Sequence, residues 1–398
     1  MKRKDIPEFG PLSGVKVLLV GASVAGPQAI SYMADFGADV IWIENPKNPD
    51  ILRQDPKASM FDLGRKNMRN LVMNTRSPEG REALLKIIAD VDILLETSRG
   101  GQWERWGLGD DVLWQVNPKL VITHVSGYGQ FGDPAYFSRP GFDPAAQAFS
   151  GYMLFTGQAA PNPPSAAVPY TADYMTAAHA CWASLAAYIK AQKTGIGESI
   201  DMAQFEVMLN AQSWIQDCIN YDLQITRGGK GPTVGIGNYP CTNGYIAVVF
   251  AGAHAMKEGL ELIGLKDDPD YAGKQSCQWG SPGDKKLDEA IINFCATHTV
   301  EECEKLFNAA GVASTPILTP DKMLTHPHYI AREVFMEWES KGKKYIGTRP
   351  LPRMKNNPGQ VWRGAPALGL DNDDILEEYG YTAEQISAMY EKGILRKA

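Results

Sequence analysis

Apolar residues in the first half of the chain occur in short, nearly continuous runs, separated by segments with helical spacing. The first run covers residues 15–20 and the next covers 40–43, while apolar positions in 26–36 recur every three or four residues. A strand that is apolar at almost every position is buried on both faces, as in a parallel sheet. These segments therefore predict a strand–helix–strand unit of an α/β fold with a parallel sheet.

The alternation continues beyond this unit. Short apolar strands are predicted at residues 70–74, 91–97 and 119–127, and a helix begins after Ser77, a suitable N-cap, with Pro78 at its first position. Residues 128–147 contain many glycines and prolines and predict irregular structure. A long alanine-rich helix then ends at Gly195, and residues 204–224 predict a second long helix.

The composition changes at residues 226–241, where glycine and proline predict a linker. A smaller α+β unit follows, with strands at 243–250 and 313–318 and helices between them, and then a hairpin over 335–352 and two short helices in the tail. The predicted segments are therefore residues 1–225, 226–330 and 331–398.

Length, composition and net charge limit the classes of protein to which this chain can belong. A chain of 398 residues can form two domains, and 44% hydrophobic with 21% charged residues is typical of a globular protein. The net charge of -7 argues against general binding to nucleic acid or to a membrane surface. There is no apolar run of 18 residues and no apolar core behind the basic start, so we expect a cytoplasmic protein without a signal peptide.

The six cysteines show no C-x-x-C pair, and we expect reduced, mostly structural thiols, with neither a metal site nor a disulfide framework. They are Cys181, Cys218, Cys241, Cys277, Cys295 and Cys303.

The turn after the first predicted strand, "GASVAG", begins at Gly21 and ends at Gly26. A nicotinamide or flavin site would normally have the pattern G-x-G-x-x-G there, with an acidic residue about 20 positions further on. Glu44 has a suitable spacing, but the middle glycine is absent, so Ala22 or Ser23 would hold a pyrophosphate away from the backbone. The turn therefore argues against NAD.

Asp173 is the most informative carboxylate in the sequence. If the long helix begins near Thr171, Asp173 lies in its first turn, where free N–H groups and the helix dipole keep a carboxylate ionised at neutral pH. Most acidic residues at such positions only support the helix. The preceding stretch is rich in glycine, proline and aromatic residues, as active-site loops often are, and this favours a catalytic role.

Basic residues follow a predicted strand at the edge where open α/β sheets bind ligands. Arg99 and Arg105 come after the strand at 91–97, and Arg65 and Arg139 occur in other loops. A single arginine is most often part of the solvated surface, but several at sheet edges of an acidic protein indicate a large anionic ligand with phosphate groups.

Several motifs resemble those of the family III CoA-transferases, the group that contains formyl-CoA transferase and carnitine CoA-transferase. They are "PLSGVKVLLVGASVAGPQAISYMADFGADVIWIE", "NPKLVITHVSGYGQFG", "RPGFDPAAQAFSGYM" and "YTADY". The likeness covers nearly the whole chain. Within the family it is strongest to the L-carnitine CoA-transferases, through "EFGPL", "VIWIEN", "LWQVNPKLVI", "VPYTADY" and "KNNPGQVWRG".

The resemblance implies roles for individual residues. Asp173 matches the nucleophilic aspartate of the family, and the first turn, with Val24 and Ala25, matches the site of the coenzyme A nucleotide. Arg99 and Arg105 match basic positions at the CoA pocket, whereas Trp106 stands where the similar carnitine enzymes have paired arginines. The family also implies a Rossmann-like large domain built from the N-terminal half and the tail, a small domain, and a homodimer of interlocked rings.

The implied reaction moves CoA from an acyl-CoA thioester to a small free carboxylic acid. Crotonobetainyl-CoA or gamma-butyrobetainyl-CoA and L-carnitine are the expected substrates, and the expected intermediates are an aspartyl anhydride and an aspartyl-CoA thioester. CoA thioesters are substrates here, so no cofactor is expected, and the loop at Gly252 is a candidate for the oxyanion site.

Other functions stay open at this point. A 2-hydroxy acid or an aryl acid could replace carnitine. An acyl-CoA racemase is a further alternative, although racemases resembling this family carry a histidine where this chain has Phe142. A nucleotide-binding module without activity would not need Asp173. Recognition of a trimethylammonium group would use aromatic faces, and aromatic residues cluster in sequence around the nucleophile: Tyr128, Phe142, Tyr152, Tyr170 and Tyr174.

Overall fold

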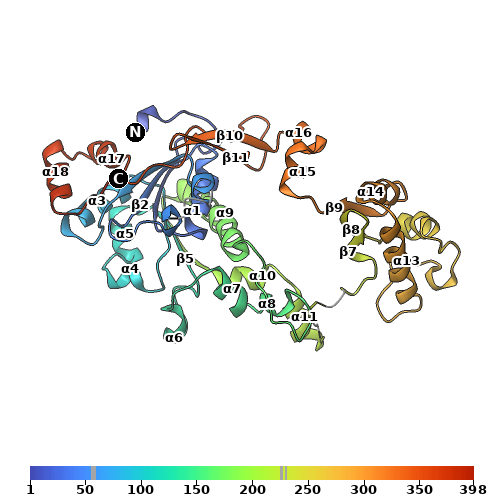
Figure 1. Ribbon diagram of the computed structural model, residues 1–398. Helices are drawn as coiled ribbons and strands as arrows, with labels where there is room; N and C mark the ends of the chain where they lie inside the picture. Colours follow the sequence, from blue (N-terminus) through green and yellow to red (C-terminus); the bar gives the residue numbers. More distant parts are fainter. Residues whose placement is uncertain (55–59, 225–226, 229–230) are drawn as a thin grey trace. The chain divides into compact units, whose positions relative to one another are not determined.

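The computed structural model describes residues 1–54, 60–224, 227–228 and 231–398 (Figure 1). They form two compact units, a large one made of Met1–Arg227 and Glu333–Ala398 and a small one made of Gly228–Arg332. The predicted boundary between residues 225 and 226, and part of the predicted 226–241 linker, lie outside the described residues.

The large unit contains a six-stranded parallel sheet with the order β3-β2-β1-β4-β5-β6, which confirms the predicted α/β class. Neighbouring strands pair in parallel throughout. The strands are β1 (Lys16–Val20), β2 (Asp39–Glu44), β3 (Met68–Val72), β4 (Ile93–Glu96), β5 (Val121–Ser126) and β6 (Glu198–Ala203). The order reverses between β1 and β4, which makes the carboxyl ends of these two strands the topological switch point of the sheet.

Helices cover both faces of this sheet, and each face has its own apolar core. One core is closed by α1 (Ala25–Ala34), α2 (Met60–Gly64) and α9 (Thr171–Thr194). The other is closed by α3 (Pro78–Ile88), α4 (Gln102–Arg105), α5 (Asp110–Val116), α17 (Asn372–Glu378) and α18 (Ala383–Glu391). This double cover explains why the strands are apolar at almost every position.

Local signals predicted several helix ends correctly. Ser77 caps α3 by accepting a hydrogen bond from the Gly80 N–H at 3.1 Å, and Pro78 is its first residue. Helix α9 begins at Thr171 and ends at Gly195, whose φ of 72° is left-handed.

Two sequence predictions for this unit are wrong. The second long helix is divided into α10 (Gln204–Asn210) and α11 (Trp214–Tyr221), because α10 packs on α9 and α7 whereas α11 contributes no fully buried residue. The stretch predicted as irregular contains α6 (Pro134–Phe137) and α7 (Asp143–Phe149), both of which begin with a proline in the first turn. Helix α8 (Tyr152–Phe155) follows. Short 3₁₀ turns occur at Arg3–Asp5 and Ile51–Gln54.

The tail returns to the large unit, where the predicted hairpin is β10 (Phe335–Ser340) paired with β11 (Lys343–Thr348). The segment around α17 then lies along β3, the edge strand of the sheet. Side chains of Asp371 and Asn372 accept hydrogen bonds from the N–H groups of Asn70 and Val72, each at 2.8 Å. These bonds satisfy backbone groups that an edge strand would otherwise leave exposed.

The small unit has an antiparallel sheet of three strands, β7 (Ile236–Cys241), β8 (Gly244–Val249) and β9 (Ala313–Pro316). Strand β7 occupies the end of the segment predicted as a linker, so that prediction is wrong there. The helices are a π-helical turn at Ala255–Gly259, α12 (Leu260–Leu262), a 3₁₀ turn at Pro269–Tyr271, α13 (Asp284–Thr297), α14 (Val300–Ala309), α15 (Pro320–Thr325) and α16 (Pro327–Ala331). In the described part of the chain, no helix combines the length and apolar character that a membrane span needs.

Candidate active site

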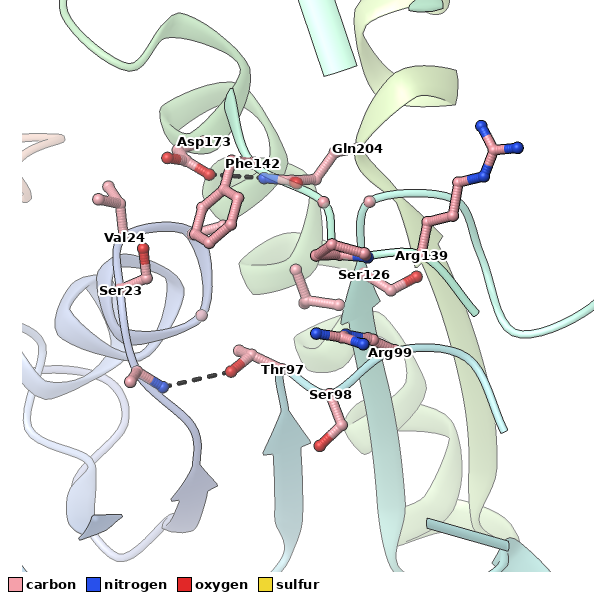
Figure 2. Close-up of a pocket in the computed structure, with 17 residues that line it drawn as sticks. Ser23, Val24, Thr97, Ser98, Arg99, Ser126, Arg139, Phe142, Asp173 and Gln204 are labelled. Carbon is pink, nitrogen blue, oxygen red and sulfur yellow. Dashed lines mark hydrogen bonds between the residues drawn. The ribbon is translucent and has the colours of Figure 1, made fainter. Parts of the chain in front are cut away.

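A cavity of about 310 Å³ lies in the large unit at the carboxyl ends of β1, β4 and β5. Its lining comes from the loops that follow these strands and from the starts of α1, α7, α9 and α10 (Figure 2). This is the switch point of the sheet, where open α/β folds bind their ligands. The structure therefore places Asp173, Arg99 and the first glycine turn around a single cavity.

The glycines of the first turn serve close packing against β4. A Cβ atom at Gly26 would lie 2.2 Å from Cγ2 of Thr97 and 3.0 Å from Cδ2 of Leu95, and at Gly21 it would lie 2.3 Å from Oγ1 of Thr97. The Ala22 N–H donates to the same hydroxyl at 3.2 Å (Figure 2). The turn is therefore fixed on the end of β4, and the missing middle glycine is consistent with a ligand other than NAD.

Asp173 lies in the first turn of α9, as predicted, and its side chain borders the cavity. The residue is only 7% exposed. Its Oδ1 accepts a hydrogen bond from Nε2 of Gln204 at 2.5 Å (Figure 2). Asp143, at the start of α7, accepts from the N–H groups of Ala172 and Asp173 at 2.6 and 3.2 Å. Asp143 therefore caps α9 from another helix and leaves the carboxylate of Asp173 free to face the cavity.

Burial, opposed by the hydrogen bond from Gln204 and assisted by the charge of Asp143, raises the pKa of Asp173 to about 6. We expected the helix N-terminus to dominate, but desolvation of the charged form outweighs it. With a pKa below 7, most Asp173 carboxylates are ionised at pH 7. A buried, ionised carboxylate is poorly solvated and can act as a nucleophile.

Four of the predicted CoA-binding residues line this cavity. Val24 and Ala25 form one side of it at the start of α1, and the exposed Arg99 and Arg139 lie on the other side (Figure 2). The guanidinium of Arg139 also stacks on Tyr136 at 4.0 Å. Two cations and a helix N-terminus thus line the same cavity as the carboxylate of Asp173, an arrangement suited to an anionic ligand.

The other two predicted residues do not line the cavity. Arg65 is 1% exposed, pairs with Asp50 at 3.1 Å and donates to the carbonyl of Ser23, so it supports the first turn from behind. Arg105 is exposed and donates to Gln102 Oε1 at 3.1 Å.

Sequence reasoning missed Gln204 and a buried histidine. Gln204 directly follows β6, so its place at the carboxyl end of a strand was a signal that could have identified it.

His124 lies in β5, with its ring 2.8 Å from Glu96 Oε1 and 3.0 Å from Asp110 Oδ1. Burial opposes its protonation, but these two carboxylates raise the pKa of His124 to about 10. Because Glu96 also accepts from the Ser98 N–H at 2.5 Å, this network fixes the loop that carries Arg99.

The aromatic residues expected near the nucleophile are dispersed. Phe142 borders the cavity, Tyr174 borders a neighbouring cavity, and Tyr128 packs against Phe149 and Phe205. Gly252, with a φ of 102°, belongs to the small unit. Within the described residues, no three metal-ligating side chains come together at this cavity.

Comparison with known proteins identifies the group to which this site belongs. The sequence pattern of CoA-transferase family III matches residues 12–372. Similar solved structures include a CAIB/BAIF family protein from Brucella suis, with 23% identity, a TM-score of 0.79, and coverage of 94% of this chain and 100% of that one. They also include Rv3272 from Mycobacterium tuberculosis, with 23% identity, a TM-score of 0.78, and coverage of 92% and 99%.

The match to the family pattern spans most of the chain and includes every residue of the cavity described above. The structural neighbours show that the fold is shared. The chain belongs to CoA-transferase family III.

Proposed function

We propose that Asp173 is the nucleophile with which this CoA-transferase moves CoA from an acyl-CoA thioester to a small carboxylic acid. The observation that carries the proposal is its position: a buried carboxylate, held by Gln204, borders a cavity at the switch point of the sheet. Arg99 and Arg139 supply positive charge at the same cavity.

In the proposed reaction, a carboxylate oxygen of Asp173 attacks the thioester carbonyl of the donor. The C–S bond breaks, CoA leaves as the thiolate, and a mixed anhydride remains on Asp173. The thiolate then attacks the aspartyl carbonyl, which releases the donor acid and gives an aspartyl-CoA thioester. The carboxylate of the acceptor acid repeats these steps in reverse, so that one difficult exchange is divided into easier ones. The reaction needs no further cofactor.

The cavity supports the assignment of CoA phosphate contacts to particular groups. The N-terminus of α1, with Val24 and Ala25, offers backbone N–H groups to an anion, and Arg99 and Arg139 offer charge-assisted hydrogen bonds. Arg65 acts indirectly, because its guanidinium is already paired with Asp50 behind the turn. Arg105 does not line the cavity, so its assignment as a CoA contact is supported by the sequence resemblance alone.

L-Carnitine is the proposed acceptor, with crotonobetainyl-CoA or gamma-butyrobetainyl-CoA as donor. This part of the proposal is supported by the sequence motifs, while the cavity contributes one aromatic face, Phe142. A 2-hydroxy acid or an aryl acid is the second candidate, because a single aromatic side chain provides little specificity for a trimethylammonium group. Phe142 cannot exchange a proton with a substrate, which argues against a racemase.

A homodimer and a cytoplasmic location complete the proposal. Interlocked rings require a chain that leaves its large unit and returns to it, and this chain does so between Arg227 and Glu333. Sedimentation analysis should therefore give a dimer, and a monomer at micromolar concentration would contradict this part.

The nucleophile is tested with Asp173→Asn. Asp111→Asn is a matched control, because Asp111 is an exposed aspartate in the first turn of α5. Asp173→Asn should abolish transfer and retain CoA binding, since an amide is a poor nucleophile, while the control keeps both. Hydroxylamine treatment of acyl-loaded enzyme followed by peptide mass mapping should place the adduct on Asp173. More than a tenth of the normal turnover in Asp173→Asn would refute the assignment.

The acceptor is tested separately, by comparing L-carnitine with its neutral isostere 3-hydroxy-5,5-dimethylhexanoate. A preference for carnitine above tenfold in kcat/KM, about 1.4 kcal/mol, supports the betaine. The preference should fall in Phe142→Leu, which removes the aromatic face. Equal use of the two acids would assign the enzyme to the hydroxy-acid branch, with the role of Asp173 unchanged.

A further inference from the structure

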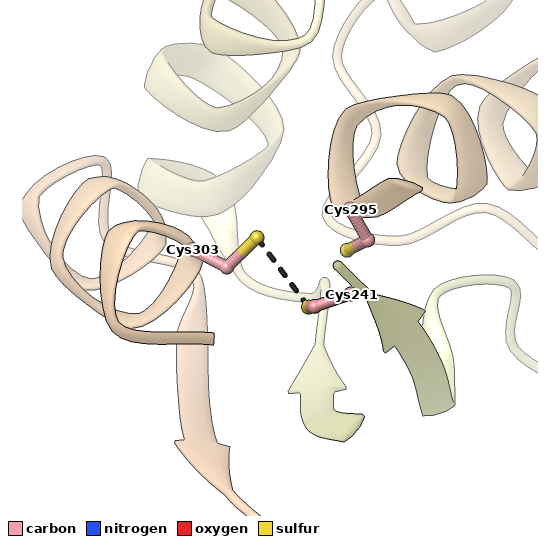
Figure 3. A group of neighbouring side chains, drawn as sticks. All are labelled: Cys241, Cys295 and Cys303. Atoms are coloured by element: carbon pink, nitrogen blue, oxygen red, sulfur yellow. Dashed lines mark hydrogen bonds between the residues drawn. The ribbon is translucent and has the colours of Figure 1, made fainter. Parts of the chain in front are cut away.

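Three cysteines that are far apart in the sequence meet in the small unit. Cys241 ends β7, Cys295 lies in the last turns of α13, and Cys303 lies in the first turns of α14. Their three sulfur atoms all lie within 4.8 Å of one another, and the Sγ atoms of Cys241 and Cys303 are 3.7 Å apart (Figure 3). All six cysteines of the chain are free thiols, so no disulfide joins this group.

The spacing of these sulfurs matches that of a three-sulfur metal site. A metal ion bound to three thiolates, with metal–sulfur bonds of about 2.3 Å, requires sulfur–sulfur separations of about 4 Å. The observed separations bracket this value, so small side-chain rotations would suffice to bring all three sulfurs into contact with one ion.

The backbone around the cysteines is held in place by bonds between the segments that carry them. Thr242, next to Cys241, donates through its N–H and its hydroxyl to the carbonyl of His298, at 3.0 and 3.1 Å. Asn243 accepts from the Val300 N–H at 2.8 Å. A capping box between Thr299 and Glu302 fixes the start of α14. The three sulfurs are therefore preorganised, which reduces the entropy cost of binding an ion.

The type and number of ligand atoms in this group favour a soft metal ion. Cys295 and Cys303 are fully buried, and Cys241 is half-buried, so one side of the cluster approaches solvent. Among the described residues no fourth protein ligand joins the group. Structural zinc sites normally have four ligands, whereas soft thiolates without hard oxygen ligands suit Cu(I).

We infer that Cys241, Cys295 and Cys303 form a binding site for a single Cu(I) ion in the small unit, separate from the transferase site. Each Cu–S bond replaces an S–H bond, and the displaced proton goes to solvent. The ion enters as Cu(I) and stays Cu(I), so no electron transfer is involved. This inference does not depend on the proposed transferase mechanism.

The experiment titrates Cu(I) into the full-length, reduced protein in competition with a chromophoric Cu(I) chelator. The combined variant Cys181→Ala, Cys218→Ala and Cys277→Ala removes the other thiols and should still bind one Cu(I) per chain. Cys277→Ala alone is the matched control for Cys303→Ala, because both cysteines are fully buried in the same core. Cys303→Ala should lower the Cu(I) affinity at least tenfold, whereas Cys277→Ala should leave it unchanged.

X-ray absorption on the wild-type protein gives a second measurement that does not rely on a variant. Three sulfur neighbours around copper are expected. Finding only two sulfur neighbours would overturn the site. So would a combined variant that retains no copper, or an equal loss of Cu(I) affinity in Cys303→Ala and Cys277→Ala. Zn(II) binding as tightly as Cu(I) in the same competition format would overturn the choice of ion.

Discussion

Asp143 and Asp173 are neighbours at the start of α9, yet the structure uses their carboxylates differently. Asp143 accepts hydrogen bonds from two backbone N–H groups and from the amide of Gln147, so three of its lone pairs are occupied. Asp173 accepts from Gln204 and otherwise faces the cavity. One carboxylate therefore secures the helix, and the other remains available for chemistry.

The pH dependence of transfer should reveal the effects of Gln204 and Asp143 on the pKa of Asp173, because the two residues shift this pKa in opposite directions. The carboxylate is the reactive form of Asp173, so kcat/KM should fall as pH drops through about 6. Gln204→Leu removes a bond that stabilises the charged form and should move this acid limb to higher pH. Asp143→Asn removes a negative charge and should move it to lower pH. Shifts of both variants in the same direction would contradict the electrostatic account.

His124 predicts a second pH effect, this time on stability. Its pKa is raised from 6.5 to about 10 by Glu96 and Asp110, so its contribution to folding is fully present below pH 6.5 and is lost as pH rises through about 10. Urea unfolding at pH 7 and pH 9.5 should show a larger loss of stability in the wild type than in His124→Gln. Parallel losses in the two proteins would show that the histidine is neutral in the fold.

At the scale of elements, the sequence was informative where burial alone decides the structure. Strands β1, β2, β4 and β5 are largely apolar and buried on both faces, and Ser77 and Pro78 mark the start of α3, so these elements were predictable. Strand β7 was missed because its residues have little strand propensity and depend on pairing with β8. Likewise, the position of Asp173 in α9 could be predicted, whereas its raised pKa depends on Gln204 and Asp143, which come from other elements.

The contact between α1 and β4 gives a test at this scale. Gly26→Ala should weaken CoA binding, because the new methyl group meets Cγ2 of Thr97 at 2.2 Å and pushes the N-terminus of α1 from the cavity. Adding Thr97→Ser removes that methyl group and keeps the hydroxyl that binds the Ala22 N–H, so the double variant should recover much of the affinity. Calorimetric titration with CoA measures both. No difference between Gly26→Ala and wild type would show that the turn has room to adjust.

At the scale of the whole molecule, the large unit is assembled from two separate stretches of chain. The second stretch contributes α17 and α18 to one apolar core and supplies side chains to the edge of β3. Residues about 300 positions apart therefore form one hydrogen-bonded border, in which Asn372 also donates to Tyr390 and to the Arg396 carbonyl.

Removing the hydrogen bond between Asn372 and the Val72 N–H should destabilise the large unit. Asn372→Ala leaves the buried Val72 N–H without its acceptor, which costs about 1 to 3 kcal/mol in the free energy of unfolding. Asn220→Ala is the control, because within the described part of the chain that exposed amide donates to a carbonyl of its own helix alone. Urea unfolding measures the difference, and light scattering should show more aggregation of Asn372→Ala, since an open strand edge pairs with other chains. Equal stability of the two variants would mean that water replaces the asparagine.

The insertion of the small unit into the large one sets an order for folding on the ribosome. Residues 228–332 are continuous and have their own core, so that unit can fold as soon as its last strand and helices emerge. The parallel sheet, made mostly earlier, has no partner for the edge of β3 until residues 371–395 are synthesised. About 300 residues separate β3 from these partners, so at typical elongation rates of about 5 to 20 residues per second the edge stays exposed for about 15 to 60 seconds during each round of translation. The first-made part of the protein is therefore the last to be completed, and that interval is when a nascent chain most needs a chaperone.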